Sequence, residues 1–202
     1  MKLTMKITMK KINGFTLIEM MVVIALLGIL ISVAIPSFQE MIKNNRSTSL
    51  INTMQGSLMY AKGEAITIGQ SVSLCKRDGT NGGVVCDNSQ NWEDGWIVFR
   101  DVNANGVIDA EDCTTTTADC TLRLSEALKP PITLRSNGTI GNTITFDSRG
   151  FAQNTGVFSL CDNRGASEAL GINVALTGTL RRLTDTNADG INDDNGTNIT
   201  CP

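Results

Sequence analysis

Residues 10–36, KKINGFTLIEMMVVIALLGILISVAIP, decide the architecture of this 202-residue chain. From Phe15 to Pro36, 17 of the 22 residues are Ala, Val, Ile, Leu, Met or Phe. About 20 apolar residues are enough to cross a bilayer as a helix. Four lysines and no acidic residue precede this segment. Because basic residues before a first apolar helix favour keeping that end in the cytoplasm, the sequence predicts a cytoplasmic N-terminus and an exported remainder.

Three hypotheses explain the apolar segment. It is a plain anchor, or a secretory signal peptide with Ser32-Val33-Ala34 as a small-x-small cleavage site, or the start of a mature chain that is cut before Phe15. The third hypothesis rests on Glu19, because a carboxylate within a membrane helix costs roughly 2.5 kcal/mol or more. No Lys or Arg lies between Lys11 and Lys43 to pair with it. Cleavage before Phe15 would create an α-amine four residues from Glu19.

Residues 10–19 resemble the prepilin leader of type IV pilins and type II secretion pseudopilins. The basic leader, Gly14 before the cut, Phe15 after it and Glu19 as the fifth mature residue all agree with that motif. The resemblance implies cleavage between Gly14 and Phe15 by a prepilin peptidase on the cytoplasmic face, followed by N-methylation of Phe15. It also implies that Glu19 sets register in a helical filament by meeting the N-terminal amine of a neighbour. Residues 1–14 would then be the leader, with Met1, Met5 and Met9 as alternative starts.

The helix is expected to continue beyond Pro36 as an amphipathic helix. Apolar residues recur there at helical spacings of three and four: Phe38, Met41, Ile42, Ile51, Met54, Leu58, Ala61 and Ala65. We therefore expect one helix from about Phe15 to Ile68, with a bend at Pro36 and an end at Gly69. Residues 15–36 would form the membrane and filament-core half, in which the resemblance assigns Glu19 and Pro36 to assembly. Residues 37–68 would pack on a sheet.

The remaining chain, residues 69–202, is predicted to be β-rich. Short strand-like runs alternate with Gly, Asn and Asp, which are turn residues: 72–76, 96–100, 122–124, 132–135, 143–146, 157–161 and 172–176. One helix followed by many antiparallel strands gives an α+β fold. This order of segments, with GWIVFRD at 95–101 and FDSRG at 146–150, resembles the GspH/FimT family of pilus and secretion proteins. The resemblance implies a type IV pilin-like head, residues 37–202, in which Trp96 and Phe99 serve as core.

All six cysteines follow the apolar helix, which predicts disulfide bonds in an exported head. Fifteen pairings are conceivable for six cysteines. Proximity in sequence favours Cys75–Cys86 and Cys113–Cys120, and these leave Cys161–Cys201 to tie the C-terminal region to the sheet. A metal site built on cysteine is disfavoured because the chain has no CxxC pair and no histidine.

Two loops have the spacing of calcium-binding sequences. In the first, oxygen-bearing side chains occupy positions 1, 3, 5, 9 and 12 of an EF-hand-like loop with Gly at position 6: Asp101, Asn103, Asn105, Asp109 and Asp112. The second repeats the pattern with Asp185, Asn187, Asp189 and Asp193. Turns rich in Asn, Asp and Gly are the alternative explanation for both. No cofactor is required by the sequence, and calcium is the candidate ligand.

The segment Gly178-Thr179-Leu180-Arg181-Arg182 is a candidate DNA-binding turn. Some pilus members of the resembled family are linked to DNA uptake through a Gly-Arg-x-Arg pattern, which Arg181 matches and Thr179 does not. The acidic residues that follow, from Asp185 to Asp194, oppose phosphate binding. A solvated hairpin is the alternative.

Composition excludes several other functions. The chain has no histidine, 18% charged residues and a formal charge of −3, so His-dependent catalysis and a bulk basic nucleic-acid surface are absent. We expect a non-enzymatic minor pilin that helps to initiate or cap a type IV pilus. A GspH-type pseudopilin of type II secretion and a DNA-binding or adhesive tip module are the alternatives. The expected partners are other pilins and a prepilin peptidase, with the inner membrane as the site before assembly and the head in the periplasm.

Overall fold

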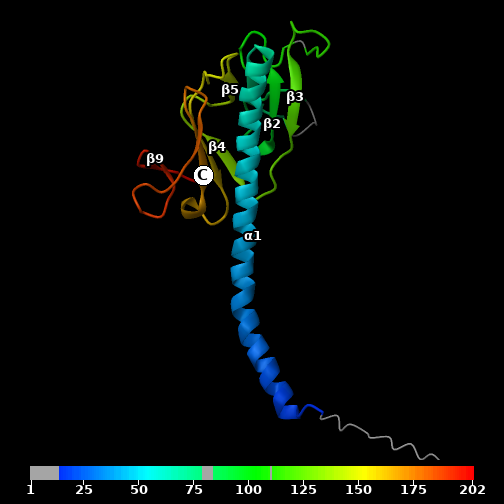
Figure 1. The fold of residues 1–202 in the computed structure, drawn as a ribbon, viewed down its shortest axis with the longest axis vertical. Helices are drawn as coiled ribbons and strands as arrows, with labels where there is room; N and C mark the ends of the chain where they lie inside the picture. Colours follow the sequence, from blue (N-terminus) through cyan, green and yellow to red (C-terminus); the bar gives the residue numbers. More distant parts are fainter. Residues whose placement is uncertain (1–13, 79–83, 110) are drawn as a thin grey trace, which may run out of the picture. The chain divides into compact units, whose positions relative to one another are not determined.

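A computed structural model describes residues 14–78, 84–109 and 111–202. Residues 1–13 of the predicted leader (residues 1–14), with its alternative starts, lie outside the described residues. The chain divides into two units, one ending at Asn44 and one running from Asn45 to Pro202. The α+β class predicted from the sequence is confirmed: a single long helix is followed by antiparallel strands (Figure 1).

Helix α1 spans Leu17–Ile68 and continues through Pro36. Its buried face begins at Ser47 and comprises Ser47, Ile51, Met54, Ser57, Leu58, Ala61 and Ala65. Packing of Phe38, Met41 and Ile42 on the sheet stays a prediction, because these residues belong to the unit that ends at Asn44. Helical periodicity predicted the correct apolar face from Ile51 onward, because Ile51, Met54, Leu58, Ala61 and Ala65 are all buried.

Two four-stranded antiparallel sheets and a small hairpin form the head. The first sheet has the order β3-β2-β1-β5 and the second the order β4-β6-β7-β8. The strands are β1 (Val72–Lys76), β2 (Trp96–Arg100), β3 (Cys120–Ser125), β4 (Thr133–Ser136), β5 (Thr143–Phe146), β6 (Gly156–Cys161), β7 (Leu170–Val174), β8 (Leu180–Arg182), β9 (Asp193–Asp194) and β10 (Thr197–Asn198). Two short 3-10 helices, η1 (Trp92–Asp94) and η2 (Ala166–Glu168), interrupt the strands. Strands β8, β9 and β10 are absent from the sequence-based prediction.

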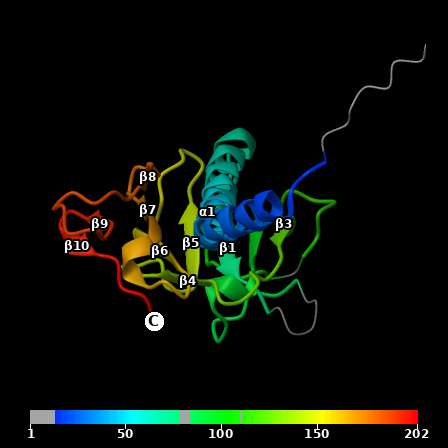
Figure 2. The ribbon, with the colours of Figure 1, turned by 90° about the horizontal axis from the view of Figure 1, so that it is seen from below.

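The main core lies between the buried face of α1 and both sheets (Figure 2). Trp92 and Phe158 meet edge to face with ring centroids 5.0 Å apart, which joins η1 to the second sheet. Strand β2 is buried on both faces: Trp96 and Val98 join the main core, whereas Ile97 and Phe99 pack in a smaller cluster with Cys75. This double burial explains why residues 96–99 are continuously apolar, and it places Trp96 and Phe99 in cores as expected.

Candidate functional site

The start of α1 carries the residues that the sequence singles out for processing. Gly14, Phe15 and Thr16 precede the helix, and Glu19 lies in its first turn. Thr16 Oγ1 accepts a hydrogen bond from the Glu19 backbone N–H at 3.2 Å, and a Glu19 carboxylate oxygen accepts one from the Thr16 N–H at 3.4 Å. This reciprocal pair is a capping box, which satisfies two donors at the helix start. The Gly14–Phe15 bond therefore lies outside the helix.

From Met20 to Ile31, helix α1 consists of apolar residues only. Its most apolar 18-residue window has a mean hydropathy of 2.7 and is wholly unburied within the described structure, so α1 is long and apolar enough to cross a membrane. Phe15 itself is 78% exposed. A surface of this kind needs lipid or other apolar helices around it.

Three disulfide bonds link the cysteines of the head: Cys75–Cys86, Cys113–Cys120 and Cys161–Cys201. They are the same pairs that sequence proximity favours. Cys161 packs with Val157, Leu183 and Ile199 in a separate apolar cluster against which Cys201 rests. The third bond therefore holds the C-terminal segment against the second sheet.

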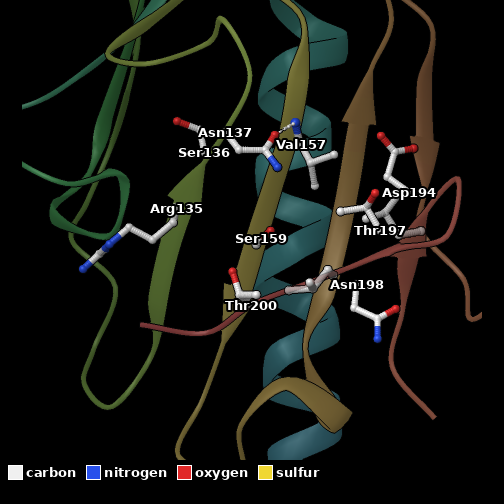
Figure 3. Close-up of a pocket in the computed structure, with 11 residues that line it drawn as sticks. Arg135, Ser136, Asn137, Val157, Ser159, Asp194, Thr197, Asn198 and Thr200 are labelled. Carbon is white, nitrogen blue, oxygen red and sulfur yellow. Dashed lines mark hydrogen bonds between the residues drawn. The ribbon is translucent and has the colours of Figure 1, made fainter. Parts of the chain in front are cut away.

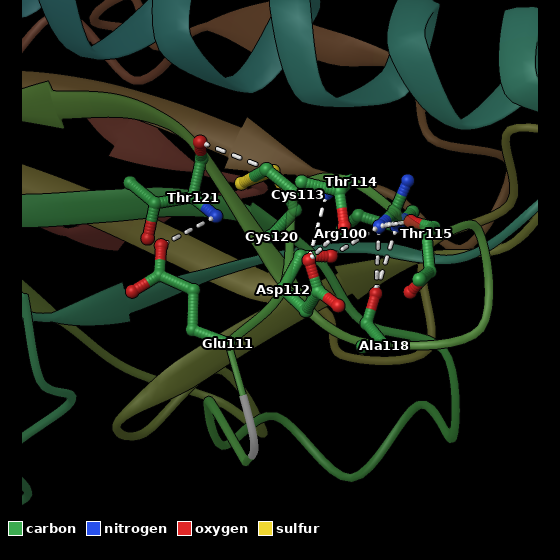
Figure 4. The surroundings of a disulfide bond; sticks show 9 residues. All are labelled: Arg100, Glu111, Asp112, Cys113, Thr114, Thr115, Ala118, Cys120 and Thr121. Carbon is green, nitrogen blue, oxygen red and sulfur yellow. Dashed lines mark hydrogen bonds between the residues drawn. A yellow bond between two sulfur atoms is a disulfide. The ribbon is translucent and has the colours of Figure 1, made fainter.

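The Cys113–Cys120 loop is wrapped around one arginine (Figure 4). The Arg100 guanidinium donates to the carbonyl oxygens of Ala118 at 2.8 Å and Asp112 at 3.3 Å, and to that of Thr115. Threonines 114–117 are exposed around this centre. The sequence gives no local signal for the role of Arg100, because its partners lie 12 to 18 residues away.

The first calcium-like loop brings together four of its five predicted residues. Asp109 Oδ2 accepts hydrogen bonds from the side-chain amides of Asn103 at 2.8 Å and Asn105 at 3.0 Å. Asp101 is fully buried and accepts from the backbone N–H groups of Asn105 and Gly106. The fifth residue, Asp112, accepts instead from Thr114, and these hydrogen bonds hold the pKa of its carboxyl below the usual value.

Asp119 is the acidic residue of this region that sequence reasoning missed. Its exposed fraction is 3%, and its carboxylate accepts from the backbone N–H groups of Val102 and Asp109 at 2.9 Å. Asp119 thus fixes the two ends of the loop. It lies outside the loop spacing, so only the tertiary fold identifies it.

The second loop adopts a closely similar backbone arrangement. Asp185 accepts from the N–H groups of residues 188, 189 and 190, and Asn187 Oδ1 accepts from the Asp189 N–H. Asp193 is fully buried and bonds to Thr186 and Gly196, which holds the pKa of its carboxyl below the usual value. Among residues 14–78, 84–109 and 111–202, no group of three or more Asp, Glu, Cys or His side chains is placed to hold a metal ion.

The two arginines considered for DNA binding are engaged within the head. Arg181 forms an ion pair with Asp194 at 2.7 Å, and Asp194 also accepts from Asn173. Arg182 donates to the Asn52 side chain of α1 at 2.8 Å. Both cations therefore have structural partners, and one of them is neutralised.

A polar hollow of about 270 Å³ lies beside the C-terminal segment (Figure 3). Its walls come from β4, β6 and residues 197–200, with Ser159 and Thr200 near its centre. Arg135 at its edge is paired with Glu93, whose carboxylate also accepts from the Leu134 N–H. Asp194, the one carboxylate among the described lining residues, is paired with Arg181.

Comparison with family models gives two matches. The model described as type II transport protein GspH matches residues 50–178, which is more than half of the chain. The model described as the prokaryotic N-terminal methylation motif matches residues 9–35. The two matches coincide with the head and with the helix start described above.

Curated relatives match the chain over a shorter stretch. A probable minor fimbrial protein of Dichelobacter nodosus is 31% identical over 90 residues, which is 42% of this chain and 56% of the relative. A second such protein from the same organism is 35% identical over 83 residues, 39% of this chain and 45% of the relative. The chain thus spans about half the length of these relatives.

The fold is similar to that of a solved minor pilin. The type IV minor pilin FimU of Pseudomonas aeruginosa superposes with a TM-score of 0.51 at 19% identity, covering 69% of this chain and 89% of FimU. At this identity the similarity concerns the fold.

Proposed function

The chain belongs to the family described as type II transport protein GspH, and from this membership we propose that it is a minor subunit that helps to initiate or cap a type IV pilus. The family match and the minor fimbrial relatives support a minor pilin or pseudopilin, and the place at the start or tip of a pilus is the finer part of the proposal. Both relatives described above are called minor fimbrial proteins, which favours the pilus over a secretion machine.

The helix start is the observation that carries this proposal. The methylation-motif match covers residues 9–35, and the capping box leaves the Gly14–Phe15 bond outside the helix. In the proposed sequence of events, a prepilin peptidase cuts this bond at the cytoplasmic face and Phe15 is N-methylated. The exposed apolar helix then leaves the inner membrane for a filament of other pilins. Glu19 offers its carboxylate to the α-amine of a neighbour, while the head lies in the periplasm.

A pseudopilin of a type II secretion system is the second candidate function. The matching family supports it, because that family is described as type II transport protein GspH. The helix chemistry is common to both machines, so no residue of the helix start separates them. The neighbouring genes distinguish the two machines. A neighbouring cluster of minor pilin genes would support the pilus proposal, whereas a secretion operon would support the pseudopilin instead.

A DNA-binding or adhesive tip module is the remaining alternative, and the engaged state of Arg181 disfavours its DNA-binding form. A direct check measures the retention of double-stranded DNA by the full-length, detergent-solubilised chain at two salt concentrations. We expect no retention. Salt-sensitive retention that is lost when Arg181 and Arg182 are both changed to Ala would establish the alternative.

Processing is tested with matched glycine variants. We expect Gly14→Val to leave the full precursor in the membrane, because a branched side chain beside the scissile bond blocks the peptidase. Gly28→Ala is the control: Gly28 lies within the helix, where an added Cβ meets no atom within 4 Å, and this variant should be cut normally. Intact mass measurement of the membrane fraction reports both. Normal cleavage of Gly14→Val would refute the proposed processing.

A further inference from the structure

The acceptor motif for N-linked glycans, Asn-x-Ser or Asn-x-Thr, occurs four times in the sequence. Its asparagines are Asn45, Asn137, Asn195 and Asn198. A match to so short a motif is informative only where the fold leaves it usable. Glycan transfer needs an asparagine amide and a hydroxyl two residues later that are both open to solvent, because the transferring enzyme binds the two groups together. The structure separates the four motifs on this criterion.

The motifs at Asn45 and Asn198 are closed by the fold. Asn45 lies within α1, and the hydroxyl of its motif belongs to Ser47, which is 2% exposed. The side-chain amide nitrogen of Asn198 donates to the Asp189 carboxylate at 2.6 Å. The residue that follows it, Ile199, is buried. Neither motif therefore presents a free amide together with a free hydroxyl.

The motif at Asn137 is held by the start of β6 and the residue before it. Asn137 Oδ1 accepts a hydrogen bond from the Val157 N–H at 2.8 Å, and the Thr139 hydroxyl accepts one from the Thr155 N–H at 2.8 Å. A Cβ built on Gly138 would collide with the Thr155 carbonyl oxygen, so this turn packs directly against backbone. Although Asn137 itself is exposed, both side chains that a transferring enzyme reads are engaged.

The motif at Asn195 leaves both groups free. Asn195 and Gly196 are the two central residues of the β9–β10 turn, with φ angles of +52° and +81°. Positive φ at both positions is typical of the type I′ hairpin turn, which Asn-Gly pairs favour. Asn195 and Thr197 are exposed, and neither side chain has a hydrogen-bond partner among the described residues. A Cβ built on Gly196 meets no atom within 4 Å, so the tip of the hairpin is open.

The base of this hairpin is fixed to the head. Asp193 is fully buried and accepts from the Gly196 N–H at 2.8 Å. Asp194 is paired with Arg181 of β8 at 2.7 Å. Figure 2 shows the hairpin at the outer margin of the head, with β6, β7 and β8 between it and α1. The turn therefore presents the Asn195 amide from a firmly held support and away from the helix.

We propose that Asn195 is the acceptor of an N-linked glycan. The donor is an oligosaccharide carried on a polyprenyl diphosphate. The Nδ2 nitrogen of Asn195 attacks the anomeric carbon of this donor, so that a C–N bond forms and the bond from that carbon to the diphosphate oxygen breaks. The polyprenyl diphosphate leaves with the electron pair, and one Nδ2 proton passes to a base of the transferase. The inference rests on the proposed function, because the head must be exported to meet the donor.

The composition of the hairpin agrees with a surface that stays in solvent. Residues 192–198, NDDNGTN, include no apolar side chain. A glycan is bulky and solubilising, so a hairpin that carries one cannot be buried between subunits. The proposal therefore also assigns the β9–β10 hairpin to the solvent-facing surface of the head.

Mass spectrometry of the full-length chain, purified from the cells that make it, tests the proposal. We expect the peptide that contains Asn195 to carry the added mass of a glycan, and electron-transfer fragmentation to place that mass on Asn195. A chain without a glycan, or a glycan on one of the other three motifs, would overturn the proposal. So would a peptide in which Asn195 shows only the small mass gain of deamidation, the spontaneous reaction to which Asn-Gly pairs are prone.

Matched variants identify the acceptor and the hydroxyl that is read with it. Asn195→Asp removes the nucleophilic amide but keeps a side chain that tolerates positive φ, so the head should fold and the glycan should be lost completely. Asn137→Asp keeps the oxygen that accepts from Val157 and should keep the glycan. Thr197→Ala should lose it, whereas Thr197→Ser retains the hydroxyl and should carry it. A glycan that persists in Asn195→Asp or in Thr197→Ala would overturn the proposal.

Peptide mapping of the same samples without reductant separates failure of the glycan site from failure of the proposed function. If the three disulfide bonds are formed and no glycan is present, the glycan site alone is overturned. If the cysteines are reduced and the head is protected from protease added to spheroplasts, the head is not exported. That result would overturn the proposed function and the glycan site together.

Discussion

Two ion pairs in the head show how burial changes the contribution of an ion pair to folding stability. Asp162 and Arg164 are joined at 2.7 Å with side-chain exposures of 5% and 12%. Asp147 and Arg149 have the same spacing and a contact of 2.8 Å, but Arg149 is 78% exposed. Hydrogen bonds from Arg164 hold the pKa of the Asp162 carboxyl below its usual value. The two pairs are therefore a matched comparison.

We predict that Arg164→Ala lowers the free energy of unfolding by about 3 kcal/mol, because it leaves a buried carboxylate without its cation. Arg149→Ala should cost less than about 1 kcal/mol at the surface. The depressed pKa of Asp162 means that its stabilisation is present above the unfolded pKa, about 4, and is lost as the pH falls through the folded value. Chemical denaturation at several pH values measures both effects. Equal costs for the two variants would contradict this account.

Candidate processing residues can be selected from the sequence because their signal is local. Gly14, Phe15 and Glu19 stand out because charge, apolar character and spacing coincide within ten residues. Arg100 and Asp119 could not be found in the same way, since their partners are carbonyl and N–H groups brought near by the fold. The Thr16 side of the capping box was overlooked, although a Thr three residues before a Glu is a recognised helix-start signal.

The observed strand bounds agree with the predicted ones for the central strands and agree less well for the short strands near the C-terminus. Strands β1, β2 and β5 have the predicted bounds, and β6 begins one residue early. Strands β8, β9 and β10 are two or three residues long, and such short pairings depend on neighbours rather than on their own composition. Asp193 and Asp194 would not be placed in a strand by propensity, because Asp is depleted there.

The disulfide bonds connect elements over different lengths of chain, and their effects on stability should differ accordingly. We predict that the double change Cys161→Ser and Cys201→Ser, which opens a sequence separation of 40 residues, lowers the free energy of unfolding by about 4 kcal/mol. Opening Cys113–Cys120, with a separation of 7, should cost about 2 kcal/mol. Denaturant titration of both variants tests the order. A larger loss for the short loop would contradict it and would point to Arg100 and its carbonyl partners.

Calcium binding by the two Asp/Asn loops, residues 101–112 and 185–193, stays a prediction. It predicts that calcium at 100 times its dissociation constant stabilises the head by about 2.7 kcal/mol and that a chelator reverses the effect. Asp189→Ala should abolish the contribution of the second loop, whereas Asp112→Ala, whose carboxylate is occupied by Thr114, should leave the effect unchanged. A melting temperature that does not move with calcium or chelator would refute both sites.

The whole molecule combines an apolar helix that requires partners with a head cross-linked by three disulfide bonds. Mean hydropathy averages to +0.00 because these two parts cancel. The family to which the chain belongs is described as type II transport protein GspH. The architecture was predictable because the apolar helix and the turn-rich head obey different periodicities. A groove between residues 55–66 and 178–180 was not predictable, since only the fold brings these two segments together.

The measurement that tests the central claim most directly is the mass of the N-terminal peptide of this chain recovered from sheared filaments. A processed filament subunit gives a peptide that begins at N-methylated Phe15, and the Gly14→Val variant gives none in that fraction. A peptide that begins after Ala34, or a chain found only as uncut precursor in membranes while filaments form, would contradict the account.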